Sequence, residues 1–541
     1  KFKIFIRNNN KNLSMTKPNF QLILQQGFDA YIKGNFIEAE RHYTTVLQNY
    51  PSHPKINNDL GLIQKSLGKL DEAELSFKKA IDLKPDFAES YNNLGNTLKE
   101  FNNLEKLKEA EKVYKNSIKL KPDYAEAHNN LGVTLQILGK LDEAELSFKK
   151  AIEFKPDFAN SYMNYGNLSI VCKKYDEAIT LFKKAVELDP NLYLVYYNLG
   201  VVLFNQGKLD EAEKNYLKVI NFNSEFSKFY NKLVNSPYKI SKLINMELNI
   251  TEILKLQNGL KGALEGKGKV SFCKKNFESA LIDFDLSNNE SSRAFALISL
   301  YNLGRIDEIY QRIEKNSELD KKNRSVAAFA SFIAQKEKKE TKLNFCKNPL
   351  NFIYYSNISS QVKDSNYLIA RIIKELNKVK TIWEPHNKTT KNGSQSRDNL
   401  FENPSRHLNK LKLIILDELD LYRSKFQDDS STFIQDWPLK KTLLAWHLVM
   451  KQQGYQLPHI HWRGWVSGVI YLKVVPALKK NEGAIEFGLN GEHYSDVNSP
   501  KVVYSPKIGD IVFFPSSLHH NTIPFTTDTD RISIAFDMVP T

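Results

Sequence analysis

Residues 126–159 read EAHNNLGVTLQILGKLDEAELSFKKAIEFKPDFA, and residues 55–88 (KINNDLGLIQKSLGKLDEAELSFKKAIDLKPDFA) nearly repeat them. Alignment on the shared Leu-Gly pair gives four further copies, at 21–54, 89–125, 160–193 and 194–227. The period is 34 residues, apart from three extra residues in the copy at 89–125. A fixed period of this length predicts an array of helix pairs, in which each unit buries its apolar face against its neighbours.

Five positions recur between copies; in the unit at 126–159 they are Gly132, Ala144, Phe148, Ala151 and Pro156. Gly132 and Ala144 are small where two antiparallel helices cross closely. Phe148 and Ala151 share a helical face that we expect to pack into the neighbouring unit, and Pro156 ends the second helix. The pattern resembles the tetratricopeptide repeat, with six units over residues 21–227.

The flanking segments extend this organisation. Residues 1–20 precede the array as an N-terminal extension, and more degenerate units are centred near Gly268 and on Leu303–Ile313. We therefore expect residues 228–345 to be helical and to continue or cap the repeats.

Four successive units carry asparagine at one helix position: Asn93, Asn130, Asn164 and Asn198. Stacked repeats would place these side chains as a ladder on the inner surface, where each amide can donate to and accept from a peptide backbone. The ladder resembles that of the O-linked GlcNAc transferase. Such amides are expected to add little to packing between repeats. The alternatives are docking of a partner protein in another way, a spacer role, or asparagines that contact water or the adjacent helix.

The last third of the chain changes character. Strand-like runs separated by turn signals predict a mainly β fold, a jelly roll or barrel. A helix is predicted at 408–426 and a polar loop at 389–404. The strand-like runs occupy 443–450, 465–475, 484–489, 501–505, 510–515 and 531–539.

Several polar residues in these runs suggest a site. His459 and His461 lie on one face because extended residues alternate, whereas adjacent His519 and His520 point in opposite directions, so at most one of them joins the first pair. Three converging imidazoles would bind a first-row transition metal. Arg531, on the last strand, shares a face with Ser533, and an arginine inside a barrel needs an anion such as a carboxylate.

The order HxH, SGVIYL, EGAIEF, GDIVFFPSSLHH and RIS resembles the iron(II)- and 2-oxoglutarate-dependent oxygenases, over residues 346–541 with a core at 443–540. It is most similar to a bacterial branch in which such a domain follows tetratricopeptide repeats. The resemblance implies a double-stranded β-helix that holds Fe(II) through His459 and His520. It also implies that Arg531, with Ser533 and Tyr471, holds the far carboxylate of 2-oxoglutarate, and that O₂ is the other cosubstrate.

His461 stands where these oxygenases usually have a carboxylate. We favour His461 as the third ligand; the alternatives are that Glu486 or Asp510 takes this role, or that His461 lies outside the coordination sphere. The remaining histidines of the region are expected to be ordinary core or surface residues: His386, His407, His447 and His493.

Composition sets further limits. A chain of 541 residues exceeds one ordinary core. The net charge of +14 comes from lysines interspersed with acidic residues, which indicates solvated helix faces rather than a nucleic-acid site. Three widely spaced cysteines exclude a disulfide framework and fit a reducing cytoplasm. No apolar run reaches the ~18 residues of a membrane helix.

The expected fold class is therefore multidomain: an all-α tetratricopeptide-repeat superhelix followed by a mainly β jelly-roll domain with flanking helices. The expected function is that of a cytoplasmic dioxygenase (hydroxylase) whose repeats recruit a peptide or protein. Two alternatives are a non-catalytic interaction or scaffold protein with a degenerate jelly roll, and a cupin-type metalloenzyme that does not use 2-oxoglutarate.

Overall fold

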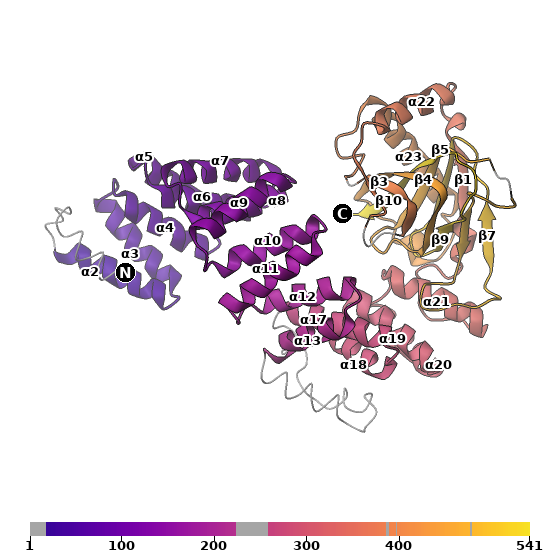
Figure 1. Ribbon diagram of the computed structural model, residues 1–541, viewed down its shortest axis with the longest axis horizontal. Coiled ribbons are helices and arrows are strands. Elements are labelled where there is room, and N and C mark those ends of the chain that lie inside the picture. The colour runs from indigo at the N-terminus through magenta and orange to yellow at the C-terminus, as the bar shows by residue number, and fades with distance from the viewer. Residues whose placement is uncertain (1–17, 223–257, 386–388, 397, 477–478) are drawn as a thin grey trace. The chain divides into compact units, whose positions relative to one another are not determined.

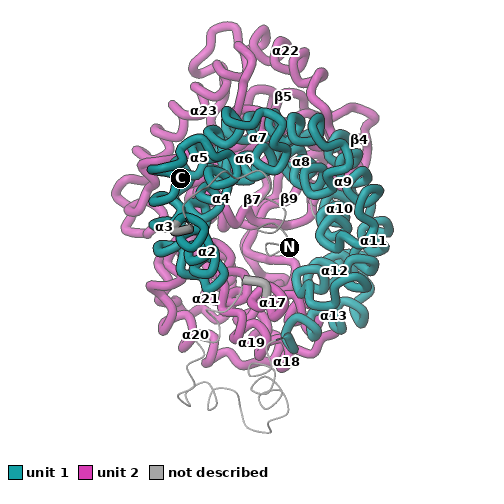
Figure 2. Tube along the Cα trace, turned by 90° about the vertical axis from the view of Figure 1, so that its left-hand side faces the viewer, with its two compact units in different colours: residues 1–222 teal, residues 223–541 magenta. Residues whose placement is uncertain are grey.

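The computed structural model describes residues 18–222, 258–385, 389–396, 398–476 and 479–541 (Figure 1). The chain divides into two compact units, residues 1–222 (unit 1) and 223–541 (unit 2), which Figure 2 distinguishes by colour. Within the described ranges, no helix has both the length and the apolar character that crossing a membrane requires.

The described part of unit 1, residues 18–222, is an array of six antiparallel helix pairs, one pair for each predicted repeat, and this confirms the all-α repeat prediction. Its helices are α2 (Pro18–Ile32), α3 (Phe36–Asn49), α4 (Pro54–Ser66), α5 (Leu70–Leu83), α6 (Ala88–Glu100), α7 (Leu104–Leu120), α8 (Ala125–Ile137), α9 (Leu141–Phe154), α10 (Ala159–Val171), α11 (Tyr175–Leu188), α12 (Tyr193–Asn205) and α13 (Leu209–Asn221).

A glycine-to-aromatic contact joins the two helices of each pair. A Cβ atom added to Gly132 would lie 2.7 Å from the ring of Phe148, so glycine is required for the close crossing. Phe148 thus packs within its own unit, where we expected it to pack into the neighbour, although it also lies 6.4 Å (ring centroids) from Tyr165 of the next unit. The same contact recurs at Gly61–Phe77, Gly95–Tyr114, Gly166–Phe182 and Gly200–Tyr216.

Unit 2 begins with five described helices: α17 (Asn258–Cys273), α18 (Phe277–Ser287), α19 (Glu290–Asn302), α20 (Ile306–Lys315) and α21 (Arg324–Glu337). Gly268 and Phe284 repeat the glycine-to-aromatic contact of unit 1, with a Cβ-to-ring distance of 2.7 Å. On α21 the rings of Phe329 and Phe332 lie 5.1 and 4.7 Å from the ring of Tyr494 in the β domain. These helices therefore share one hydrophobic core with the β domain.

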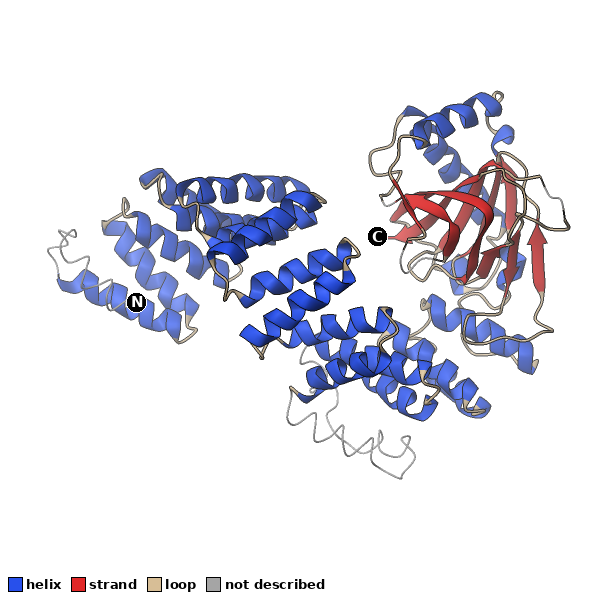
Figure 3. Ribbon diagram, in the orientation of Figure 1, coloured by secondary structure: helices blue, strands red, loops and turns tan. Residues whose placement is uncertain are grey.

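The β domain holds the strands of unit 2, shown in red in Figure 3. Flanking helices are α22 (Ser365–Leu376), α23 (Arg406–Lys425) and the short α24 (Thr432–Gln435). The strands are β1 (Tyr354–Asn357), β2 (Thr381–Trp383), β3 (Thr390–Ser396), β4 (Lys441–His459), β5 (Val466–Lys473), β6 (Ile485–Gly488), β7 (Lys501–Tyr504), β8 (Asp510–Pro515), β9 (His519–Thr522) and β10 (Arg531–Pro540).

All described strand pairs are antiparallel, and the main path through the sheet runs β1-β8-β5-β10-β4-β9-β6-β7. Off this path, β3 pairs with both β4 and β2. The long strand β4 belongs to two groups: Lys441–Met450 pairs with β10, and Gln456 and His459 pair with β9. Between these parts the strand bends at Gln453, which has a φ of 62°. The groups face each other, because Phe487 of β6 lies 5.0 Å from Phe514 of β8. This two-sided arrangement agrees with the predicted jelly roll.

The predicted loop at 389–404 was wrong in its first half, since residues 390–396 form β3. Ser394 and Gln395 pair with Val449 and Leu448 of β4. Serine and asparagine disfavour strands only weakly, and pairing with a long neighbouring strand outweighs that preference.

Candidate metal centre

The two groups of strands bring three histidines together at one end of β4. His459 ends β4 and is the direct cross-strand partner of His520 on β9. His461 follows two residues later, and its backbone N–H donates to the Ser516 carbonyl at 2.9 Å. The ring centroids lie 4.3 to 5.1 Å apart, and one nitrogen from each ring lies within 4.8 Å of the others. Within the described residues, this group contains no carboxylate.

Each ring faces a hydrogen-bond acceptor through Nδ1. The acceptors are the Leu457 carbonyl for His459 (2.7 Å), the Asp537 carboxylate for His461 (2.5 Å) and the Leu518 carbonyl for His520 (3.3 Å). A neutral imidazole that donates from Nδ1 carries its lone pair on Nε2. All three rings are thus held in the tautomer that can bind a metal through Nε2.

Burial keeps His520 in its neutral form. The residue is 4% exposed, and desolvation, together with the neighbouring His459 and His461 rings, holds the pKa of His520 well below its usual value. A metal ligand must be deprotonated, so this environment suits coordination. The donor set of three neutral imidazoles fits a first-row transition metal such as Fe(II).

The carboxylates considered as substitutes for His461 are engaged elsewhere. Glu486 pairs with Lys501 at 3.0 Å. Asp510 accepts hydrogen bonds from Asn357, Tyr504 and the Lys507 backbone at 2.7 to 2.8 Å. Their positions favour His461 over either carboxylate at this site.

His519 points away from the histidine cluster, as strand alternation predicts. Its ring stands edge-on to Tyr494, with centroids 5.7 Å apart and planes at 90°. Burial lowers the pKa of His519 to about 4.

Asp537, which the sequence analysis missed, completes the surroundings of His461. Its Oδ1 lies 2.5 Å from His461 Nδ1 and accepts from the Ser467 hydroxyl at 2.7 Å. Ser467 also contacts the Ser516 hydroxyl at 2.7 Å. Alternation along β10 could have revealed it, because Arg531, Ser533 and Asp537 differ by even numbers of residues and so share one face.

Arg531 is a buried cation that has no carboxylate partner among the described residues. It is 2% exposed; its Nε donates to the Gly483 carbonyl at 3.2 Å, and the guanidinium lies 4.9 Å from the centre of the Tyr471 ring. Among the described residues, no carboxylate forms an ion pair with it. Desolvation lowers the pKa of Arg531, which reflects the cost of burying this charge.

Two hydroxyl groups near Arg531 form no hydrogen bond of standard geometry with the described residues. Ser533 is the cross-strand neighbour of Tyr471 between β10 and β5, and both hydroxyls are buried without a hydrogen bond of standard geometry in the described protein. Burial raises the pKa of Tyr471 to about 12, so this side chain stays protonated and can donate at neutral pH. A buried guanidinium with two hydroxyl donors nearby is suited to bind an anionic ligand.

The other histidines of the domain lie away from this site. His407 pairs with Glu375 at 2.6 Å, and the His493 ring packs on Phe272 at 5.1 Å. His447 is buried on the opposite face of β4, next to Ile534 in register, and neither of its ring nitrogens has a hydrogen-bond partner within the described protein. His386 lies outside the described residues.

The asparagines of the predicted ladder are tied to the preceding repeat. The Nδ2 groups of Asn93, Asn130, Asn164 and Asn198 donate to Oδ1 of Asn58, Asn92, Asn129 and Asn167 at 2.7 to 3.0 Å. The expectation that these amides add little to packing between repeats was therefore wrong, because each links two successive repeats.

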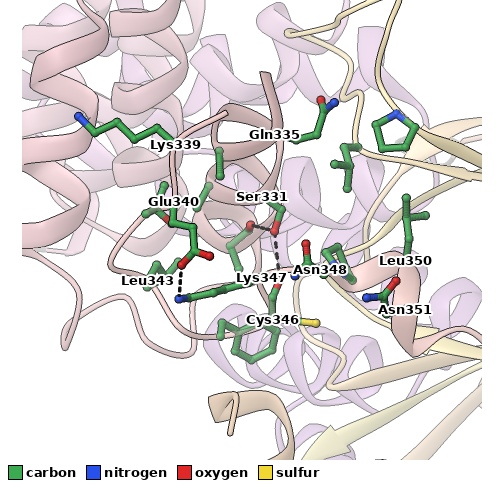
Figure 4. Close-up of a pocket in the computed structure, with 18 of the residues that line it drawn as sticks. Ser331, Gln335, Lys339, Glu340, Leu343, Cys346, Lys347, Asn348, Leu350 and Asn351 are labelled. Atoms are coloured by element: carbon green, nitrogen blue, oxygen red, sulfur yellow. Dashed lines mark hydrogen bonds and ion pairs between the residues drawn. The ribbon is translucent and has the colours of Figure 1, made fainter. Parts of the chain in front are cut away.

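A pocket of about 380 Å³ lies elsewhere in unit 2, between the C-terminal half of α21 and residues 338–351 (Figure 4). Ser331 and Gln335 of α21 line it, together with the ion pair between Glu340 and Lys347 at 2.9 Å. None of the three clustered histidines lines this pocket.

Comparison with known proteins agrees with this division of the chain. Residues 444–537 match the family model described as "Putative 2OG-Fe(II) oxygenase". Models of the tetratricopeptide repeat match 61–102, 99–136, 125–158, 172–207 and 193–226. A search of the curated proteins found no match.

Similar solved structures include tetratricopeptide repeat proteins. The crystal structure of MamA is 29% identical, covering 32% of this chain and 92% of its own, with a TM-score of 0.28. A thermophilic tetratricopeptide repeat protein of Thermus thermophilus is 24% identical, covering 34% and 99%, with a TM-score of 0.31. A tetratricopeptide repeat protein of Parabacteroides merdae is 18% identical, covering 52% and 100%, with a TM-score of 0.36.

The helix pairs of unit 1 and the strands around the histidine cluster thus correspond to separate family matches: residues 61–226 carry tetratricopeptide repeats, and residues 444–537 match the model described as "Putative 2OG-Fe(II) oxygenase".

Proposed function

We propose that the β domain is an iron(II)- and 2-oxoglutarate-dependent dioxygenase that hydroxylates its substrate. The observation that carries this proposal is the buried Arg531, which has no carboxylate partner among the described residues and lies beside two unused hydroxyls. Burying an uncompensated cation costs several kcal/mol. An anionic cosubstrate would supply the missing partner.

His459, His461 and His520 would hold the iron through Nε2, which leaves coordination positions for small molecules. Bound iron(II) would supply the oxidative chemistry, in which O₂ and 2-oxoglutarate yield succinate, CO₂ and a hydroxylated substrate. The distal carboxylate of 2-oxoglutarate would pair with the planar fork of Arg531, and Tyr471 and Ser533 would donate to the same group.

Two observations support a common interior for the histidine cluster and Arg531. Asp537 contacts His461, and Asp537 lies on the same face of β10 as Arg531 and Ser533. Cross-strand register adds Val469, opposite Ala535 on β10, and Val512, opposite Val469 on β8, to this face. These apolar side chains exclude water, which strengthens the pairing of Arg531 with an anion.

The test is release of succinate from 2-oxoglutarate by the purified full chain. Turnover that requires both iron(II) and 2-oxoglutarate would support the proposal. A metal-dependent reaction that ignores 2-oxoglutarate would favour a cupin-type enzyme. Metal binding without any turnover, with or without candidate substrates, would favour a non-catalytic interaction protein.

We propose further that the repeats recruit a peptide or protein to this enzyme. The Nδ2 groups of the ladder already bond to the preceding repeat, but within the described residues no donor reaches Oδ1 of Asn93, Asn164 or Asn198. These oxygens can accept backbone N–H groups of an extended peptide. The ladder would then read the peptide backbone through acceptors alone.

The cytoplasm is the proposed site of action. The three cysteines, Cys172, Cys273 and Cys346, form no disulfide. Reduced cysteines are usual in that compartment.

A further inference from the structure

A metal ion bound by the three histidines would keep its full positive charge. A divalent cation bound by imidazoles alone keeps its full charge of +2, whereas the usual site with one carboxylate ligand neutralises part of it. Within the described residues, the cluster contains imidazoles and no carboxylate. In a partly buried site, a negative charge near the metal would be worth more than in water.

Asp537 is positioned to supply that charge through His461. The side chains of His461 and Asp537 are 12% and 11% exposed, and Asp537 Oδ1 lies 2.5 Å from His461 Nδ1. A carboxylate that accepts from the far nitrogen of a ligating imidazole fixes the tautomer and makes the ligating nitrogen more basic.

The surrounding chain holds Asp537 in place. Its backbone is fixed in the sheet opposite Ser467 of β5 and Leu444 of β4, and the Ser467 hydroxyl donates to Oδ1 at 2.7 Å. At Gly464 an added Cβ would lie 3.2 Å from Asp537 Cγ and 2.4 Å from Ser516 Oγ. The backbone therefore closes over the carboxylate and leaves it little freedom to turn from the histidine.

We propose that Asp537 is a positioning residue of the metal centre, which delivers through His461 the negative charge that other members of the family provide with a carboxylate ligand. This inference rests on the metal-binding part of the proposed function and not on the use of 2-oxoglutarate. Asp537 does not itself contact the metal; it orients and polarises a ligand that does.

The experiment measures metal affinity rather than turnover. The metal-free full chain is titrated with Co(II) against a competing chelator, and the Co(II) absorption bands report the coordination of the ion. Asp537→Asn preserves the shape of the side chain and removes its charge. Its affinity for Co(II) should fall by about 10- to 100-fold, which is the usual effect of losing such an outer partner.

Two further variants separate positioning from general structure. In the H461A background, adding D537N should change the remaining Co(II) affinity by less than about threefold, because the route through His461 is gone. Glu278→Gln removes an acidic charge whose side chain is 58% exposed, on helix α18, and should leave Co(II) affinity unchanged.

Folded D537N that binds Co(II) as tightly as the unmodified chain would overturn the inference, and so would an equal loss in the H461A background. If the metal-free D537N chain fails to fold, Asp537→Glu replaces it: retained affinity supports a role for the charge, and a loss beyond tenfold in a folded D537E chain refutes it. Absence of 2-oxoglutarate turnover alongside the expected Co(II) results would refute the oxygenase proposal and leave this inference standing.

Discussion

Replacement of Arg531 by methionine should separate a ligand-binding role from a structural one, because the two roles predict opposite changes in stability. Methionine approximates the length of the arginine stem and removes the charge. Arg531 is 2% exposed, its Nε donates to one backbone carbonyl, and no described carboxylate pairs with it.

The expected loss of 2-oxoglutarate affinity can be worked out from these contacts. A bidentate pair between Arg531 and a carboxylate provides two charge-assisted hydrogen bonds, and truncating a buried pair costs ~2–4 kcal/mol. This corresponds to a roughly 30- to 1000-fold weaker affinity. The free energy of unfolding of the ligand-free protein should stay unchanged or rise, since a buried uncompensated cation is replaced by an apolar side chain.

The assay is calorimetric titration of 2-oxoglutarate into the anaerobic, Co(II)-loaded chain, combined with thermal unfolding of the ligand-free form. Lys451→Met is the matched control, because Lys451 neighbours Met450 in sequence but is 52% exposed and pairs with Asp530. Co(II) affinity should be the same in all three proteins. Unchanged 2-oxoglutarate affinity in R531M would refute the assignment, and a clear loss of ligand-free stability would indicate a structural arginine.

Three other predictions follow from the structure. His520→Ala should weaken Co(II) binding far more than His519→Ala, because His519 packs on Tyr494 and lies outside the cluster. The reverse order of effects would show that the wrong histidine has been assigned. Joint replacement of the four ladder asparagines by alanine should raise the KM for a protein substrate. It should also lower the free energy of unfolding of the repeats, measured by denaturant titration, by ~2–6 kcal/mol, because each of the four lost hydrogen bonds contributes ~0.5–1.5 kcal/mol. Burial lowers the pKa of His447 from 6.5 to about 4, so as the pH drops below 6.5 the unfolded chain binds this proton first and the free energy of unfolding falls. At pH 5 the protein should lose ~2 kcal/mol of stability relative to His447→Leu, whereas this pH-dependent difference should vanish above pH 7.5. Parallel stability profiles of the two proteins against pH would contradict the prediction.

The sequence alone determined the features of this protein that depend on short-range contacts. A tetratricopeptide unit closes within 34 residues, so the period alone predicted the helix pairs and a close helix crossing at Gly132, although it did not show that Phe148 fills that crossing. Alternation along a strand likewise separated His520 from His519, because adjacent extended residues face opposite sides whatever the rest of the fold does.

Contacts between distant segments were decided only by the tertiary structure. Asp537 reaches His461 across 76 residues; alternation places it on the face of Arg531 and Ser533, but no local pattern shows that it contacts His461. Only the folded structure shows that the hydroxyls of Tyr471 and Ser533 are buried without a hydrogen bond of standard geometry to the described residues. The ladder asparagines show the same limit: their period predicted the row, but only the stacking of one repeat on the next decided which amide hydrogens were already bonded. Spacing along the chain specifies which residues can share a face, whereas the partner that satisfies each polar atom depends on segments brought together by the whole fold.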